Sequence, residues 1–267
     1  MKVQTEVGKV RVAHLVPSCG RAELMMKNMG KMRDVWNRPG TFMAIDRREV
    51  KAYREVIQTL DKVEWITYDN KDRFVGRALE TLRAAATERA YDYYVLSDDN
   101  CVFTKESFTN LVRATAEYGK PVHMAGSHPT AKHFDAKRIR KDSVKQNGLT
   151  VYRKMTWIFR CVPHEVYSKF KYPDLPCYAD RYFTMWMIAH GYFHFRCVLE
   201  APFTKKRFVR GGIGEKHERS RSALGLAMMA KDFAPFWGSL EVRIPWEELI
   251  KLNRNMRKQK RRDKDSK

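Results

Sequence analysis

The 267-residue sequence has no long hydrophobic run and few cysteines, and both absences exclude classes of protein. No stretch approaches the roughly 18 consecutive apolar residues of a membrane-spanning helix, and the N-terminus carries no signal-peptide core. The five cysteines are odd in number and scattered, without the spacing of a metal site, as is typical of reduced thiols. We therefore expect a soluble, cytoplasmic protein whose cysteines carry no chemistry.

Acidic residues are scarce relative to basic ones. The sequence has 52 Lys and Arg against 31 Asp and Glu, for a formal net charge of +21. This excess is far more than one small nucleotide needs, and it predicts attraction to a polyanion. No internal repeat, P-loop, helix-turn-helix signal or zinc-finger pattern accompanies it.

The basic residues gather in three blocks, at residues 132–160, 205–221 and 251–267. We expect these basic blocks to contact phosphates, although such runs are often solvated surface, and residues 254–267 are expected to form a disordered tail. Residues 123–148 are predicted to be a long basic loop. Residues 156–159 are expected to form a buried strand, while aromatic neighbours such as Tyr152 and Trp157 are either core or stacking platforms for bases.

The segment YDYYVLSDDN at residues 91–100 is a short apolar strand followed by adjacent carboxylates. Open α/β sheets bind ligands at the C-terminal ends of their strands, which is where Asp98 and Asp99 are expected. Two acids and the amide of Asn100 offer oxygen ligands for Mg²⁺ or Mn²⁺, with positions left for a substrate's phosphates. The alternative is a simple turn or helix cap, which the same residue types favour.

The same pattern, an apolar run ending in a carboxylate, occurs upstream. Further strands are expected at residues 10–18, 41–46 and 63–69, with helices following Arg21 and spanning residues 76–89. Strands that alternate with helices predict a mostly parallel sheet. Asp46 and Asp69 would then lie along the same edge as Asp98 and Asp99, unless each is only a turn residue at a strand end.

Several short motifs resemble, in order and rough spacing, the nucleotide-binding half of family-2-like GT-A glycosyltransferases. They are Pro17-Ser18-x-x-Arg21, Ile45-Asp46, Gly76-Arg77-Ala78-Leu79 and Leu96-Ser97-Asp98-Asp99-Asn100-Cys101-Val102-Phe103. The resemblance covers about residues 10–220. It implies a Rossmann-like α/β fold with a mostly parallel central sheet flanked by helices. A single catalytic domain would span residues 1–253, with a nucleotide-sugar and metal half at about 10–110, an acceptor half at about 120–220, and the basic tail beyond.

The resemblance also implies a nucleotide-sugar donor, such as a UDP-sugar, and a divalent ion, Mn²⁺ or Mg²⁺. By position, Asp99 would bind the metal, Asp98 would face the ribose or the water shell of the metal, and Asp46 would contact the base. Arg77 would lie beside the base or its phosphates. The remaining nucleotide-binding candidates are Pro17, Ser18 and Arg21. Because Ser97 and Asn100 stand where many relatives carry acids, the choice between Asp98 and Asp99 as direct ligand stays open.

The acceptor half contains Asp180 at the start of a predicted helix whose end carries Gly191. In inverting GT-A enzymes an acid in this place takes the proton of the acceptor hydroxyl, which requires a carboxylate within hydrogen-bond reach. An acid stabilised by the helix dipole is the compatible alternative.

A glycine-rich basic loop at residues 207–217 follows the acceptor helix. Gly212 and Lys216 are candidates for contacts with the leaving diphosphate. His217 resembles a third metal ligand, and a solvated turn is the alternative.

Together these features predict a metal-dependent glycosyltransferase that acts on a nucleic acid. In its most specific form the acceptor is a 5-hydroxymethylated cytosine or a related base, flipped out of duplex DNA. The resemblance implies that such chemistry belongs chiefly to bacteriophages, which would place the protein in the host-cell cytoplasm. One alternative is a transferase for a cell-surface glycan or lipid, with the tail on an anionic membrane. Another is a metal-dependent nuclease or a non-catalytic nucleic-acid binder. The oligomeric state is not predicted.

Overall fold

The computed structural model describes residues 2–5, 8–70, 74–127, 143–146, 148–152, 159–192, 196–205 and 218–233. Within these ranges the strands are β1 Lys2–Thr5, β2 Gly8–Pro17, β3 Thr41–Asp46, β4 Glu64–Tyr68, β5 Tyr93–Leu96, β6 Cys101–Phe103, β7 Val122–Ser127, β8 Ser143–Gln146, β9 Leu149–Tyr152, β10 Arg160–Pro163 and β11 Arg196–Lys205. The helices are α1 Ala22–Trp36, η1 Arg47–Glu49, α2 Arg54–Thr59, α3 Val75–Thr87, α4 Lys105–Tyr118, α6 His164–Tyr167, α7 Ala179–Ala189 and α8 Glu218–Phe233.

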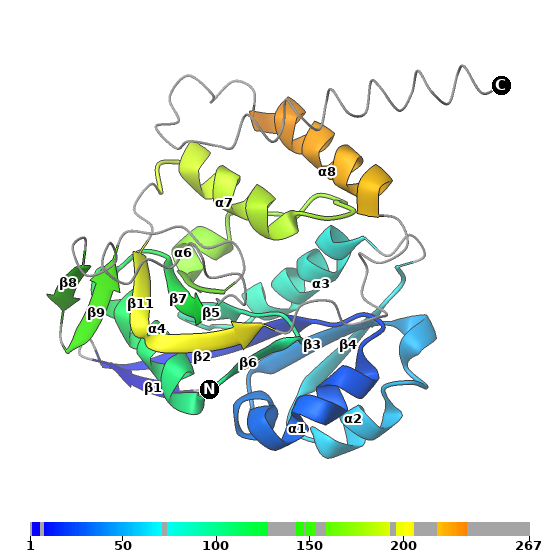
Figure 1. Ribbon diagram of the computed structural model, residues 1–267, viewed down its shortest axis with the longest axis horizontal. Helices are drawn as coiled ribbons and strands as arrows, with labels where there is room; N and C mark the ends of the chain where they lie inside the picture. Colours follow the sequence, from blue (N-terminus) through cyan, green and yellow to red (C-terminus); the bar gives the residue numbers. More distant parts are fainter. Residues whose placement is uncertain are drawn as a thin grey trace.

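These strands form one sheet in the order β4-β3-β2-β5-β10-β7-β11-β9-β8, with β1 paired to β2 and β6 to β11. The first four strands of this order are parallel, and helices cover the sheet (Figure 1). All residues of β3 are buried, as expected for a parallel strand covered on both faces. The predicted α/β fold is therefore confirmed, and its parallel part coincides with the strands that the apolar runs predict.

The side chains of β2 point alternately to the two faces of the sheet, and each face carries one layer of the core. Val12 and Val16 pack in one hydrophobic cluster with residues of α1 and α4. Ala13 and Leu15 belong to a second cluster, which includes residues of α3 and α7. Because successive side chains of a strand point to opposite faces, one strand supports both layers. The layers hold the C-terminal ends of β2 and β5 side by side, which matters for the site below.

The second half of the sheet is mixed. β10 is antiparallel to β5 and β7, whereas β11 is parallel to β7. The expectation of an unbroken loop over residues 123–148 is wrong at both ends, because β7 and β8 occupy them. Residues 128–142 lie outside the described residues, as does most of the strand expected at residues 156–159. The described strand begins at Arg160.

A close backbone approach joins the two halves of the chain. The Gly76 N–H at the start of α3 donates a hydrogen bond of 3.0 Å to the carbonyl of Leu175. A Cβ at Gly76 would lie 2.1 Å from the carbonyl oxygen of Pro173. Glycine at this position therefore allows the segment that leads into α7 to pack directly on α3.

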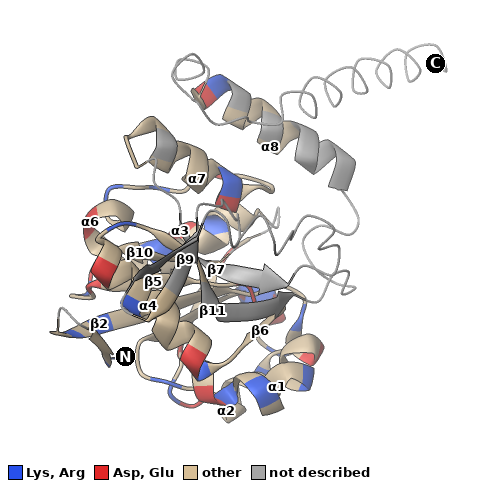
Figure 2. Cartoon of the chain, turned by 60° about the vertical axis from the view of Figure 1, so that its left-hand side comes forward, with Lys and Arg blue, Asp and Glu red and all other residues tan. Residues whose placement is uncertain are grey.

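Charge is spread over the described surface. Basic positions are interspersed with acidic ones, for example around α1 and α2 (Figure 2), and most of the three basic blocks lies outside the described residues. In the described part of the chain, no helix is both long and apolar enough to cross a membrane. Cys19, Cys101, Cys161 and Cys177 form no disulfide in that part of the chain.

Candidate active site

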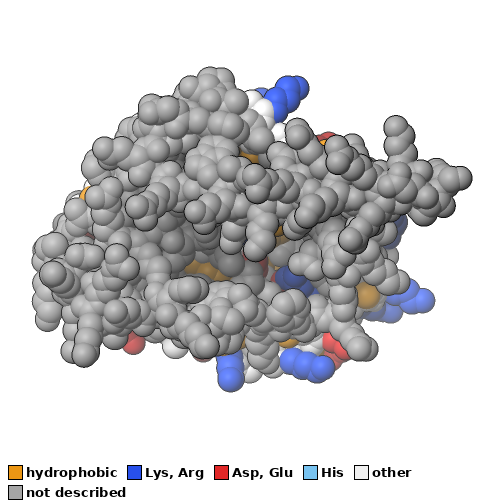
Figure 3. Space-filling view, turned by 45° about the horizontal axis from the view of Figure 1, so that its top comes forward, with side chains coloured by type: hydrophobic (Ala, Val, Ile, Leu, Met, Phe, Trp, Pro, Cys, Tyr) orange, Lys and Arg blue, Asp and Glu red, His pale blue; other side chains and the backbone are white. Residues whose placement is uncertain are grey.

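A cavity of about 130 Å³ lies at the C-terminal ends of β2, β4 and β5, beside the start of α3. Its lining consists of Pro17, Ser18, Cys19, Arg21, Tyr68, Val75, Ala78 and Asp98. It is smaller than the roughly 300–1,000 Å³ of a typical ligand pocket, so it has room for only part of a nucleotide-sized molecule. Figure 3 shows hydrophobic, acidic and basic side chains of the described residues close together on one face. Four predicted residues, Pro17, Ser18, Arg21 and Asp98, line the cavity.

Asp99 lies behind the cavity in a closed polar network. Its side chain is fully buried, and its Oδ1 is 2.5 Å from Nη1 of Arg21. Ser18 donates a hydrogen bond of 2.5 Å to the other carboxylate oxygen, and the Ser18 hydroxyl is also 2.7 Å from that of Tyr53. The Tyr53 hydroxyl accepts a hydrogen bond of 2.9 Å from the backbone N–H of Arg21. Ser18, Arg21, Tyr53 and Asp99 therefore fix one another.

Arg21 interacts electrostatically with two carboxylates, Asp99 inside the network and Asp98 beside it. Burial raises the pKa of Asp99, and the nearby Arg21 and Ser18 oppose that rise. Burial alone would lower the pKa of Arg21, but Asp99 and, more weakly, Asp98 raise it overall. Arg21 therefore remains a cation and offsets part of the negative charge of Asp98 and Asp99. Sequence reasoning missed Tyr53, because nothing in the sequence marks a tyrosine in a surface-like segment as a partner of the motif residues.

Ser97 faces away from this network. It is hydrogen-bonded at 2.8 Å to Nε2 of His14, a fully buried residue of β2. Burial lowers the pKa of His14 to about 3, with a smaller contribution from Arg38, so this imidazole is neutral. Ser97, which stands where many GT-A relatives carry an acid, therefore makes a contact between two uncharged side chains inside the core.

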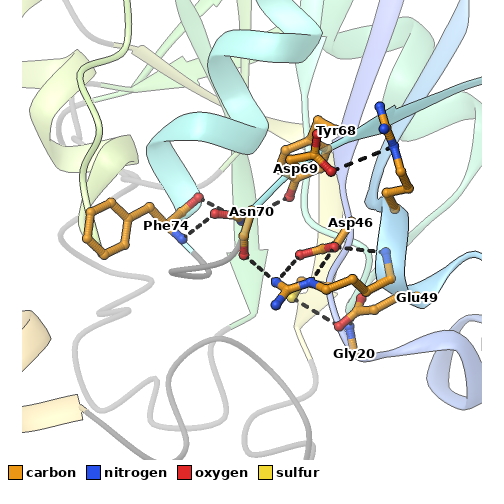
Figure 4. A network of polar contacts seen from close by, with 10 residues as sticks. Gly20, Asp46, Glu49, Tyr68, Asp69, Asn70 and Phe74 are labelled. Carbon is orange, nitrogen blue, oxygen red and sulfur yellow. Dashed lines mark hydrogen bonds and ion pairs between the residues drawn. The ribbon is translucent and has the colours of Figure 1, made fainter.

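Asp46 is engaged by a neighbouring arginine (Figure 4). It ends β3 with 1% of its surface exposed. Its oxygens accept hydrogen bonds of 3.0 Å from Nε and 2.6 Å from Nη2 of Arg48, which also contacts the carbonyl of Asn70 at 2.6 Å. Asp46 is not among the described cavity-lining residues, so its contact with a base stays a prediction.

Arg77 and Asp69 also lie away from the cavity lining. Arg77 on α3 donates to Asp174 at 3.3 Å from Nε and 2.7 Å from Nη2, and this contact lowers the pKa of Asp174. Asp69 is an exposed residue 3.6 Å from Arg47. The predicted role of Arg77 beside the base therefore stays untested, while its observed contact ties α3 to the segment before α7.

Asp180 lies in the first turn of α7, as predicted, and a buried arginine holds that turn. Arg160 is 1% exposed, and its Nη2 donates a hydrogen bond of 2.9 Å to the carbonyl of Asp180. Its Nη1 donates to the Thr184 hydroxyl at 2.8 Å, and its Cζ lies 5.1 Å from the centre of the Phe183 ring. Burial lowers the pKa of Arg160, whereas Tyr172 and Asp180 oppose that change. The expectation that all of block 132–160 contacts phosphates is wrong for Arg160, because solvent does not reach it.

The remaining candidates, Gly212, Lys216 and His217, lie outside the described residues. Within the described ranges, no three His, Cys, Asp or Glu side chains gather in a group that could hold a metal ion. Asp98 lines the cavity, while Asp99 lies behind it with both oxygens engaged. Since Mg²⁺ is often held by one or two carboxylates together with substrate phosphates, this donor set fits an ion that binds together with a diphosphate.

No family model and no curated protein matches the sequence, but solved structures match its fold. GalNAc-T7, crystallised with UDP, GalNAc and Mn²⁺, has a TM-score of 0.54 at 10% identity, over 83% of this chain and 48% of its own. TarS of S. aureus has a TM-score of 0.56 at 8% identity, over 84% and 39%. Glucosyl-3-phosphoglycerate synthase of Mycobacterium tuberculosis, crystallised with Mn²⁺, UDP-glucose and phosphoglyceric acid, has a TM-score of 0.54 at 11% identity, over 83% and 80%.

This chain therefore spans about half or less of the length of GalNAc-T7 and TarS. At such low identity the similarity establishes the fold alone. The fold is that of the GT-A glycosyltransferases, as the sequence motifs predict.

Proposed function

We propose that this protein is a nucleotide-sugar-dependent glycosyltransferase whose donor nucleotide binds in the cavity between β2, β5 and α3. One observation carries the proposal: Pro17, Ser18, Arg21 and Asp98, chosen from the sequence as donor-binding residues, line a single cavity. Its position at the C-terminal ends of parallel strands is where α/β sheets bind ligands. A fold shared with glycosyltransferases crystallised with UDP or UDP-glucose and Mn²⁺ supports a UDP-sugar donor.

The lining of the cavity combines two kinds of chemistry. Tyr68, Val75 and Ala78 offer apolar surface for a planar ring, whereas Arg21 and Asp98 are charged. An orientation with the base against α3 and the phosphates toward Arg21 satisfies both kinds of lining. In this orientation the diphosphate of the donor points toward the Arg21 guanidinium.

The proposal includes Mn²⁺ or Mg²⁺. When bound, such an ion neutralises charge on the departing diphosphate. The resemblance assigns this ion to Asp99 and His217. Among the described residues, Asp98 is the carboxylate that lines the cavity and so meets an incoming ion first.

Asp180 is the proposed general base. A carboxylate at the start of a helix is well suited to this role when its backbone is held rigidly, because it must reach the acceptor hydroxyl. Arg160 supplies that rigidity by binding the Asp180 carbonyl and the Thr184 hydroxyl, which itself donates to the same carbonyl at 3.0 Å. We assign Arg160 a positioning role.

The acceptor is proposed to be an anion, and in the specific form a 5-hydroxymethylated base of duplex DNA. The support for DNA is the net charge of +21, which exceeds the need of the donor alone. The comparisons offer no support for a DNA acceptor. Since one structural neighbour was crystallised with phosphoglyceric acid, a small anionic acceptor is the nearest alternative.

Calorimetry with UDP and UDP-glucose in the presence of Mn²⁺ tests the proposed donor site. The variant Val75→Phe, at the cavity wall, is expected to weaken binding, whereas Leu224→Phe, 49% exposed on α8, serves as the control. Equal donor affinity in all three proteins would place the nucleotide elsewhere. Absence of binding for UDP, ADP, GDP and CDP alike would refute the proposed function.

A further inference from the structure

Arg21 has hydrogen-bond donors at the cavity that are not used within the described structure. Its side chain is 24% exposed and belongs to the cavity lining. Nη1 is engaged by Asp99, but Nε is buried without a hydrogen-bond partner in the described structure. A buried N–H without a partner is costly, so an unsatisfied one beside a cavity indicates a ligand acceptor.

The geometry of the guanidinium selects the chemistry of that acceptor. Nε–H and one Nη2–H point in the same direction and form a fork that matches two phosphate oxygens. Because Nη1 binds Asp99 at 2.5 Å, the fork is the part of the side chain left for a ligand. Arg21 also caps the start of α1, a helix of 15 residues without a side-chain cap, and that helix end adds positive potential.

Asp99 is better placed to orient Arg21 than to bind a metal. Its side chain is fully buried, and both carboxylate oxygens have partners within 2.5 Å. For Asp99 to ligate an ion, Arg21 would have to leave a buried ion pair, which is unfavourable unless the ion replaces it. The contacts with Ser18 and Tyr53 further restrict where the guanidinium can lie.

We infer that Arg21 binds the diphosphate of the donor through its Nε and Nη2 donors, and that Asp99 is the anchor that aims Arg21. The inference rests on the proposed function for the identity of the ligand. It assigns the two neighbouring acids different tasks: Asp98 meets the metal, and Asp99 holds the arginine. The anchored cation then binds the diphosphate in the absence of metal and stabilises it as a leaving group.

The test measures binding of UDP, uridine and inorganic pyrophosphate by calorimetry in excess chelator. Arg21→Lys keeps a cation beside Asp99, so the fold is retained, but it removes the fork. We expect this variant to weaken the binding of UDP and of pyrophosphate by about 10- to 100-fold, which is the effect of losing hydrogen bonds to a charged group. The binding of uridine should be unchanged. Arg89→Gln, which removes an exposed arginine paired with Glu64, is the matched control and should bind all three as the wild type does.

The roles of the two acids are separated by Mn²⁺ binding, followed by electron paramagnetic resonance in the presence of UDP. Asp99→Asn should weaken metal-free UDP binding and keep Mn²⁺ binding, whereas Asp98→Asn should do the reverse. Loss of Mn²⁺ binding in Asp99→Asn with unchanged metal-free UDP affinity would overturn the anchor role.

Unchanged UDP affinity in Arg21→Lys would overturn the role of Arg21 in binding the diphosphate and leave the proposed function standing. Pyrophosphate bound through Arg21 with no nucleotide bound would refute the proposed function and keep the anion site. If the wild type bound neither UDP nor pyrophosphate, both the proposed function and the anion site would be refuted.

Discussion

Replacement of Arg21 by a neutral residue is expected to destabilise the protein through Asp99. In the wild type, the fully buried Asp99 carboxylate has the guanidinium at 2.5 Å and one hydrogen bond from Ser18. In Arg21→Gln only that hydrogen bond remains. Removal of one partner of a buried ion pair costs about 3–5 kcal/mol, which is a large part of the roughly 5–15 kcal/mol stability of a typical domain.

The cost should depend on pH in a defined direction. Burial already raises the pKa of Asp99 while Arg21 opposes the rise, so loss of Arg21 raises it further. A carboxyl whose pKa is higher in the folded than in the unfolded state destabilises the fold when ionised. The deficit of Arg21→Gln relative to wild type should therefore be full at alkaline pH. It should shrink as the pH falls through the raised pKa of Asp99 in the variant, and vanish once Asp99 is protonated in the folded wild type as well.

Urea denaturation at several pH values between about 5 and 8 checks this expectation, with Arg21→Gln/Asp99→Asn as the matched control. The double variant buries no charge, so it should regain most of the lost stability and lose the pH dependence. A double variant as unstable as Arg21→Gln, or a single variant that loses less than about 1 kcal/mol, within the range of an exposed ion pair, would refute the description of Asp99 as a buried charge neutralised by Arg21.

Further outcomes test other parts of the account. Asp180→Asn should keep donor affinity in calorimetry and cut the rate of sugar transfer by roughly 10²–10⁴-fold; lost affinity with unchanged turnover of bound donor would make Asp180 a binding or capping residue. Gly76→Ala should lower the free energy of unfolding by about 1–3 kcal/mol, because its Cβ meets the Pro173 carbonyl; an unchanged denaturation midpoint would contradict that packing. Deletion of residues 254–267 should lower the salt dependence of DNA binding and raise the acceptor KM with kcat nearly unchanged; salt-independent DNA binding would exclude phosphate contacts.

The parallel half of the fold was predictable because burial on both faces leaves a continuous apolar run. β3 coincides with the expected strand at residues 41–46, and β2 and β5 each lie within two residues of expectation at their C-terminal ends. Parallel strands deliver their ends to one edge, which is why Asp98 could be placed at that edge from the strand pattern. Ser18 and Arg21 were grouped with it by the resemblance to GT-A glycosyltransferases. The mixed half was harder, since β7 pairs with strands distant in sequence and its apolar pattern is weak.

The partners of charged residues could not be predicted in the same way. Arg160 lies in a block read as phosphate-binding, yet its partners are 20 and 24 residues away on a helix that buries it. Arg48 engages Asp46 two residues earlier, and this pair looks in sequence like any exposed charges. A count of charges gives the sign of a surface, but it does not identify which arginines are withdrawn from that surface by tertiary packing.

The most direct measurement is a transfer assay with a panel of nucleotide sugars, Mn²⁺, and either unmodified or hydroxymethylated duplex DNA, analysed by mass of the nucleosides and by release of nucleoside diphosphate. The account predicts release of a nucleoside diphosphate, in step with a sugar added to the acceptor, in the wild type and its loss in Asp180→Asn. Sugar transfer to a small anionic acceptor but not to DNA would show that the proposed DNA acceptor is wrong and that the proposed transferase activity is right. No consumption of any donor, with or without acceptor, would contradict the central claim.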